Sequence, residues 1–124
     1  MPVRTPLSRP FPRSARLLRP VEFRQVFADA HRISDQHLSM LARANDLTHA
    51  RIGLAISRRS VPRAVDRNRI KRIVRETFRQ QLISLPALDI VIMARPDARK
   101  LNSAELHRTL DRLWLRLIKR CSAS

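Results

Sequence analysis

The segment Ala64–Leu82, AVDRNRIKRIVRETFRQQL, combines a dense set of cations with apolar residues at helical spacing. On a helical wheel one broad sector contains Ile70, Ile73, Val74, Thr77 and Phe78. This sector predicts an amphipathic helix over about 64–83 whose apolar face packs on a core. A second sector points largely away from that face and holds Asn68, Lys71, Arg72, Arg75 and Arg79, with Arg67 and Arg69 beside it in the first turn.

Few acids accompany these cations. Residues 57–80 contain only Asp66 and Glu76 against nine cations, which are Arg58, Arg59, Arg63, Arg67, Arg69, Lys71, Arg72, Arg75 and Arg79. A solvated helix face would place acids for i,i+4 pairing, yet the clear candidates are only Arg72 with Glu76 and Asp66 with Arg69. We therefore expect this surface to bind phosphate groups. Asn68, between two arginines, is expected to contact a phosphate or a 2′-hydroxyl.

The composition of the whole chain also indicates a polyanionic partner. The 124 residues carry a net charge of +16, and all but three of the 26 basic residues are Arg. Solubility alone needs a charge of only about 2–8 in a small domain, and Arg favours bidentate phosphate contacts and stacking on bases. No apolar run approaches the ~20 residues that span a bilayer, so a membrane partner is not expected. The single Cys121 fits a reducing cytoplasm and is expected to be inert.

The chain divides into an arm, one domain and a short tail. Residues 1–18 hold four of the eight prolines and several Arg and Ser, which predicts a flexible basic arm. Residues 19–120 are expected to form a single RNA-binding domain, long enough for one core, and 121–124 the tail. A first helix is expected over about 20–30, with Pro20 in its first turn and Phe23, Val26 and Phe27 at helical spacing.

Alternating and continuous apolar runs predict the strands. Residues 36–44 and 51–57 alternate and are expected to pair as two antiparallel strands. Gly53, the only glycine, indicates that another group lies close to the backbone there. The run LDIVIMA, 88–94, suits an interior strand, and RPDARKL after it is expected to be a polar loop.

A last helix extends to about 120, with Asn102 and Glu105 as a capping box and an apolar stripe from Leu106 to Ile118. The order predicts a two-layer α/β sandwich of α+β type, with a small mixed sheet of three to four strands and about three helices.

The basic segment resembles the signature of the bacterial ribonuclease P protein component. The resemblance rests on Ser57-Arg58-Arg59 and on the Arg-Asn-Arg motif Arg67-Asn68-Arg69 with its basic helix. It extends to RPVEFRQVF, RIGLAIS and LDIVIMARP, and so covers about residues 16–97. Pro62 stands in a connection where the family often has Gly, so a loop that needed a positive φ would differ here.

The resemblance implies a protein subunit of an endoribonuclease that removes the 5′ leader of precursor tRNA. The catalytic RNA subunit would hold the Mg²⁺ ions, and no protein-bound cofactor or small-molecule substrate is expected. RNA-subunit binding is implied for Arg58, Arg59, Arg63, Arg67, Asn68, Arg69, Lys71, Arg72, Arg75 and Arg79. A leader-binding cleft is implied for Phe23, Phe27 and Ser57. The family also implies a left-handed strand–helix–strand crossover.

The residues themselves suggest no catalytic or metal-binding group. No paired carboxylates lie at helical spacing, and the four histidines are scattered over different elements. For Phe23 and Phe27, core packing at i,i+4 is the alternative to stacking on RNA bases. Two other functions remain open: a general RNA-binding protein of ribosomal type, and a DNA-binding protein that places helix 64–83 in the major groove.

Overall fold

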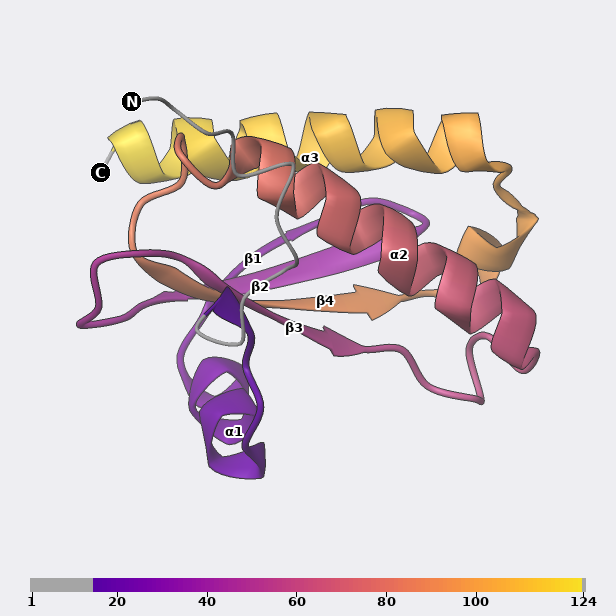
Figure 1. The fold of residues 1–124 in the computed structure, drawn as a ribbon, viewed down its shortest axis with the longest axis horizontal. Helices are drawn as coiled ribbons and strands as arrows, with labels where there is room; N and C mark the ends of the chain where they lie inside the picture. Colours follow the sequence, from indigo (N-terminus) through magenta and orange to yellow (C-terminus); the bar gives the residue numbers. More distant parts are fainter. Residues whose placement is uncertain (1–14, 124) are drawn as a thin grey trace, which may run out of the picture.

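The computed structural model describes residues 15–123, and the elements follow the chain in the order shown in Figure 1. They are α1 (Pro20–Ala28), β1 (His31–Ser34), β2 (Leu38–Ala44), β3 (Arg51–Ala55), α2 (Ala64–Gln81), β4 (Leu88–Ala94), the short 3₁₀ helix η3 (Pro96–Lys100) and α3 (Ser103–Ala123). The mixed four-stranded sheet with three α-helices confirms the predicted fold class. The segment expected to be a polar loop after β4 forms η3 instead.

The strand order is β1-β2-β4-β3, so one expected pairing is wrong. We expected β2 and β3 to pair, but β4 lies between them, antiparallel to β2 and parallel to β3. The physical reason is burial: β4 is the most apolar strand, and a central position gives it a hydrogen-bonding partner on each edge. The short edge strand β1 was not located in the sequence, because Ile33 is its only buried residue.

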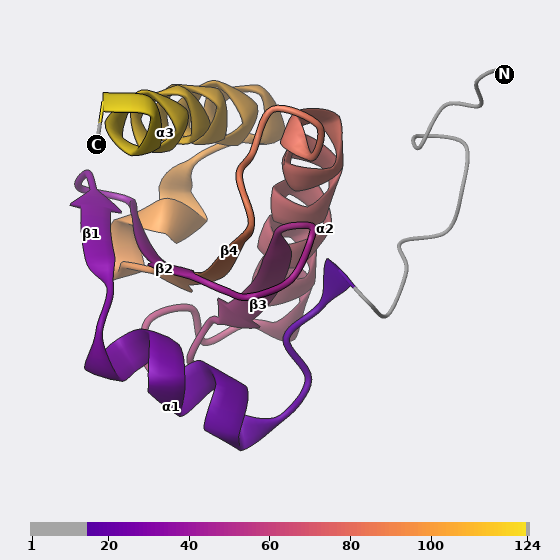
Figure 2. The same cartoon turned by 90° about the vertical axis from the view of Figure 1, so that its left-hand side faces the viewer.

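The strand–helix–strand unit β3-α2-β4 has the left-handed sense that the family resemblance implies. Both strands run in the same direction, and α2 passes over the sheet between them. The two views together place β3 and α2 on the same side of β4, and the chain turns in a left-handed sense as it advances along the strands (Figures 1 and 2). Such crossovers are rare, since about 98% are right-handed.

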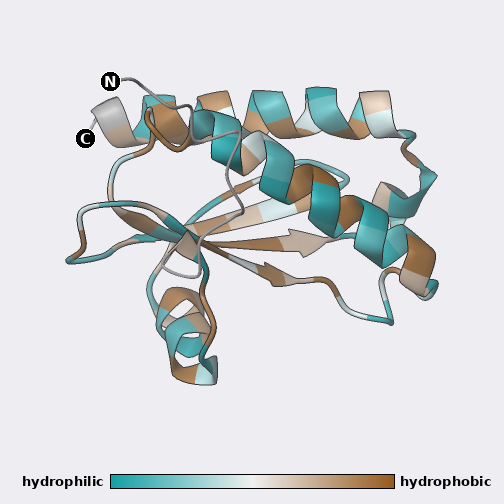
Figure 3. Ribbon diagram, in the orientation of Figure 1, coloured by the Kyte–Doolittle hydropathy of each residue, from teal (hydrophilic) through white to brown (hydrophobic). Residues whose placement is uncertain are grey.

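Helices α2 and α3 cover one face of the sheet, and α1 lies on the other (Figures 1 and 2). The main core lies between the sheet and the two long helices. All five residues of the predicted apolar sector of α2 are buried there, and brown apolar segments of the helices face the sheet in Figure 3. A smaller cluster under α1 consists of Leu17, Val26, Leu41 and Val91.

The start of α3 agrees with the sequence prediction, whereas the start of the domain does not. The capping box of α3 forms as expected, since Asn102 Oδ1 accepts the Glu105 N–H at 2.8 Å and Glu105 Oε1 accepts the Asn102 N–H at 2.9 Å. The first boundary lies earlier than residue 19, because Ala15 and Leu17 are buried and the Leu17 N–H donates to the Ile52 carbonyl at 2.8 Å. Residues 1–14 of the expected arm lie outside the described residues.

Candidate nucleic-acid interface

One side of α2 presents a row of polar and cationic side chains. We call it the α2 ridge; it consists of Asn68, Arg69, Lys71, Arg72, Arg75 and Arg79. Asn68 and Arg72 are exposed and the other four are half-buried. Neither ion pair considered from the sequence, Arg72 with Glu76 or Asp66 with Arg69, forms between these described residues. Glu76 Oε1 instead lies 3.7 Å from His107 Nε2 of α3. Among the described residues, no carboxylate forms an ion pair with Arg69, Lys71, Arg72 or Arg75 of the ridge.

The loop before α2 holds three further predicted cations, and a fourth, Arg67 of α2, is hydrogen-bonded to it. Arg58, Arg59 and Arg63 are exposed. The half-buried Arg67 instead donates from Nη1 to the carbonyls of Val61 at 2.9 Å and Pro62 at 2.8 Å. Arg67 thus fixes the loop to the helix, a role that sequence reasoning missed. No described residue has a positive φ, so Pro62 is compatible with this loop.

Ser57 also belongs to this loop. Its Oγ accepts the Ser60 N–H at 3.1 Å, and its carbonyl accepts the Val61 N–H. Ser57 does not line the pocket that contains Phe23. Its side chain therefore shapes the turn after β3, and the structure does not bring it together with the two predicted phenylalanines.

A pocket of about 170 Å³ lies where α2, β3 and the segment before α1 meet. Arg16, Lys71 and Arg75 supply its charge, and Phe23 and Leu17 are among its apolar walls. No acidic side chain is among the described residues that line it. Burial, together with repulsion from Arg16, lowers the pKa of Arg75 below its usual value. An anion bound here would relieve that repulsion. Sequence reasoning missed Arg16 because it lay in the expected arm.

The two phenylalanines of α1 have different environments. Phe23 is half-buried against the small cluster under α1, as core packing predicts, and it also lines the pocket; its stacking on RNA bases stays a prediction. Its ring lies over Gly53, where a Cβ would come within 2.6 Å of Phe23 Cζ. This close approach confirms the neighbour that the lone glycine predicted. Phe27 is 49% exposed and is available for stacking on a base.

The comparisons with known proteins agree with this geometry. The family model described as Ribonuclease P matches residues 11–118. A ribonuclease P protein component from Methylococcus capsulatus is 57% identical over 114 residues, which cover 92% of this chain and 89% of that protein.

The chain belongs to the ribonuclease P protein family.

Solved structures of the family show the same fold. The ribonuclease P protein of Staphylococcus aureus at 2.0 Å superposes with a TM-score of 0.78 and 25% identity, covering 85% of this chain and 95% of that chain. The protein of Thermotoga maritima gives a TM-score of 0.72 and 26% identity, with 82% and 96% covered. A second relative by sequence, from Thioalkalivibrio sulfidiphilus, is 49% identical over 90% of this chain and 93% of its own length.

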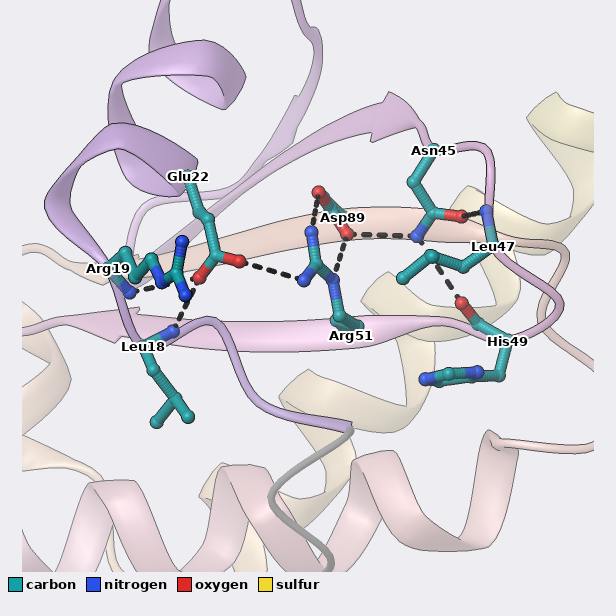
Figure 4. Close-up of polar contacts among 8 residues, drawn as sticks. All are labelled: Leu18, Arg19, Glu22, Asn45, Leu47, His49, Arg51 and Asp89. Carbon is teal, nitrogen blue, oxygen red and sulfur yellow. Dashed lines mark hydrogen bonds and ion pairs between the residues drawn. The ribbon is translucent and has the colours of Figure 1, made fainter.

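In this member of the ribonuclease P protein family, a partly buried polar network attaches α1 to the sheet (Figure 4). Arg51 of β3 binds Asp89 of β4 in a bidentate pair at 2.8 and 2.7 Å, and its Nη1 donates to Glu22 of α1 at 2.9 Å. Asn45 Nδ2 also donates to Asp89 at 2.8 Å. These partners raise the pKa of Arg51, Asp89 contributing most. No sequence pattern pointed to this network, since its members are 67 residues apart at the extremes.

Glu22 connects the network to the start of α1. Its Oε1 accepts the N–H groups of Leu18 at 2.8 Å and Arg19 at 2.9 Å. These backbone hydrogen bonds, the one from Arg19 above all, and the Arg51 guanidinium lower the pKa of Glu22. The network therefore sets where α1 places Phe23 and Phe27 relative to the pocket.

The described residues offer no evident site for metal or membrane chemistry. Within residues 15–123, no group of three or more His, Cys, Asp or Glu side chains is arranged to hold a metal ion. No helix in this range is both long and apolar enough to cross a membrane. Burial raises the pKa of the Cys121 thiol, which disfavours the nucleophilic thiolate.

Proposed function

We propose that this ribonuclease P protein subunit binds the catalytic RNA with its α2 ridge and holds the 5′ leader of precursor tRNA beside Phe23 and Phe27 of α1. Family membership supports the general role in tRNA processing. The finer assignment rests on one observation: three cations and one aromatic ring line a pocket that is continuous with the α2 ridge through Lys71 and Arg75. Cations bind phosphates and the ring stacks on a base, so the site accepts RNA without reading its sequence.

In this proposal Arg58, Arg59, Arg63, Arg69 and Arg72 contact the RNA subunit, and Arg67 acts by fixing their loop to α2. The catalytic centre and its Mg²⁺ ions belong to the RNA subunit. The protein contributes fixed positive charge near the substrate, which lowers the counter-ion concentration that the RNA needs.

Cleavage of precursor tRNA by a bacterial ribonuclease P RNA at low Mg²⁺, with and without the protein, tests the proposal. We expect correct 5′ cleavage with this protein and not with an equally basic control protein. If the control serves equally well, the general RNA-binding alternative replaces the proposed processing role.

The leader assignment is tested with Phe27→Ala, because this exposed side chain is absent from both core clusters. We expect KM to rise for a substrate with a long leader and to stay unchanged for a substrate with a one-nucleotide leader. Leu115→Ala, which removes an exposed side chain from α3, is the matched control. Equal KM values for wild type and Phe27→Ala on both substrates would contradict the leader assignment.

A further inference from the structure

Helix α3 carries a second row of cations that the proposed function does not use. Arg108, Arg112, Arg116 and Arg120 recur at every fourth position, and Lys119 lies beside them; all five are exposed. We call these five residues the α3 stripe. Positions four apart on a helix lie on one side and are about 6 Å apart along the axis. The stripe is therefore a regular line of positive charge.

The α3 stripe lies on the opposite side of the molecule from the α2 ridge. Arg116 Nη1 donates to the Ser34 carbonyl and Arg120 Nη1 to the Arg32 carbonyl, both at 3.3 Å, so the stripe borders β1. The other side of α3 faces α2, where Trp114 Nε1 donates to Thr77 Oγ1 at 2.9 Å. Figure 2 shows β1 below α3 at one side and α2 at the other.

The charge of the stripe is not neutralised by the protein. None of its five residues forms an ion pair with a carboxylate of the described chain. Asp111 is exposed on the same helix without such a pair, and Asp35 Oδ1 is occupied by the N–H groups of His37 and Leu38 at 2.8 and 2.9 Å. Like charges four residues apart destabilise a helix. A polyanion along the stripe would offset that repulsion.

A hollow of about 390 Å³ opens beside the stripe, between α3 and the turn that connects β1 and β2. Asp35, Gln36, His37, Arg112, Leu113 and Arg116 line it. The two guanidinium groups and the Gln36 amide supply donors, while the only carboxylate is held by backbone N–H groups. This arrangement is suited to phosphate oxygens.

We propose that the α3 stripe binds the phosphate backbone of a second RNA segment, so that the protein bridges two segments from opposite sides. The proposal rests on the proposed RNA-binding function and extends it to a new surface. An RNA strand repeats its phosphates at a spacing similar to that of the stripe, which allows several contacts at once. Isolated anions would gain no such advantage.

The test uses the variant Arg108→Gln/Arg112→Gln/Lys119→Gln, which leaves the two arginines bound to β1 in place. Its affinity for a bacterial ribonuclease P RNA, and separately that of the assembled holoenzyme for precursor tRNA, is measured at several salt concentrations. We expect the plot of log association constant against log salt concentration to become less steep, by about 2–3 in the magnitude of its slope, for one of the two RNAs. The RNA that shows this change is the one that the stripe binds. Arg108→Lys/Arg112→Lys keeps the charge and is expected to keep the slope.

Backbone footprinting locates the contact. The triple variant should lose protection in an RNA segment that remains protected with Arg69→Gln/Arg72→Gln on the α2 ridge. Unchanged slopes and footprints for both RNAs would overturn the proposal, while continued sensitivity to the ridge variant would leave the proposed function intact. Loss of all protection together with a lower unfolding temperature would assign the stripe to folding and also overturn the proposal. If the ridge variant binds like wild type, the proposed function itself fails.

Discussion

Arg67 and Arg69 are two residues apart in the same motif, yet their side chains have different environments. Nη1 of Arg67 donates to two loop carbonyls, whereas Nη1 of Arg69 is buried and has no acceptor among the described residues. A buried donor without an acceptor carries a desolvation cost that a bound acceptor would reduce. Arg67 therefore positions the loop, and Arg69 is the residue of the pair to which the proposed function assigns an RNA contact.

We expect Arg69→Ala to weaken RNA-subunit binding about 5–10-fold without changing the unfolding midpoint, because it removes about 1 kcal/mol of phosphate contact. Arg67→Ala should lower both affinity and stability, the latter by about 1 kcal/mol, since two hydrogen bonds to the loop are lost. Filter binding and urea unfolding measure the two effects. Equal stability of Arg67→Ala and wild type would contradict the positioning role.

Gly53 is required by the close approach of Phe23 to β3. A Cβ at this position would lie 2.6 and 2.7 Å from two ring atoms of Phe23 and 3.0 Å from Leu17 Cβ. We expect Gly53→Ala to displace the ring at a cost of about 1–3 kcal/mol and to raise KM for long-leader substrates. Ala55→Gly on the same strand is the control, because it changes backbone freedom without adding a Cβ, and it should leave the Phe23 ring in place. A Gly53→Ala protein with wild-type stability and KM would refute this packing argument.

At the level of elements, α1 is attached by the polar network as well as by apolar contacts. The cluster beneath it contains four buried residues with Phe23 and Ala30 partly buried against them, while Leu18, Val21 and Phe27 are exposed. Arg51 compensates by joining α1, β3 and β4 through Glu22 and Asp89. The position of α1, and with it the proposed leader site, is thus held by charge pairs across three elements.

The lowered pKa of Glu22 gives this attachment a pH dependence. A carboxyl whose folded pKa lies below its ordinary value of 4.5 stabilises the fold above that pH, and the contribution is lost as the pH falls toward the folded pKa. We expect Glu22→Gln to lower stability at pH 7 by about 1–3 kcal/mol and to flatten the loss below about pH 4.5.

Urea unfolding at three pH values measures this effect. Asp97→Asn is the matched control, because Asp97 and Lys100 form an exposed pair at 3.4 Å that contributes little. If Glu22→Gln retained the full acid sensitivity of wild type, the network would not be its source.

At the level of the whole molecule, the net charge of +16 acts against compactness. Multivalent anions that bind the folded cationic surfaces should therefore raise the unfolding temperature. We expect inorganic sulfate to stabilise the protein by about 2–3 kcal/mol when its concentration is 100 times Kd. Sodium chloride at equal ionic strength should do less, since it only screens the charges. Equal effects of the two salts would show that screening alone is responsible.

Much of the fold and part of the site could be predicted because the signals are local. The apolar period of Ala64–Gln81, the α3 capping box and the run Leu88–Ala94 each lie within one segment, and each formed the expected element. The α2 cations were visible because hydrophobic periodicity fixes which face of a helix is exposed. The roles assigned to them in RNA binding remain predictions.

The sequence by itself determined the three α-helices, the strands other than β1, the cationic face of α2 and the membership of the family. Only the tertiary structure decided that β4 separates β2 from β3, that Arg16 joins Lys71 and Arg75, and that Arg51 connects α1 to the sheet. These features depend on contacts between residues far apart in the chain. Periodicity reports which face of a segment is buried, but it does not report which segment will cover that face.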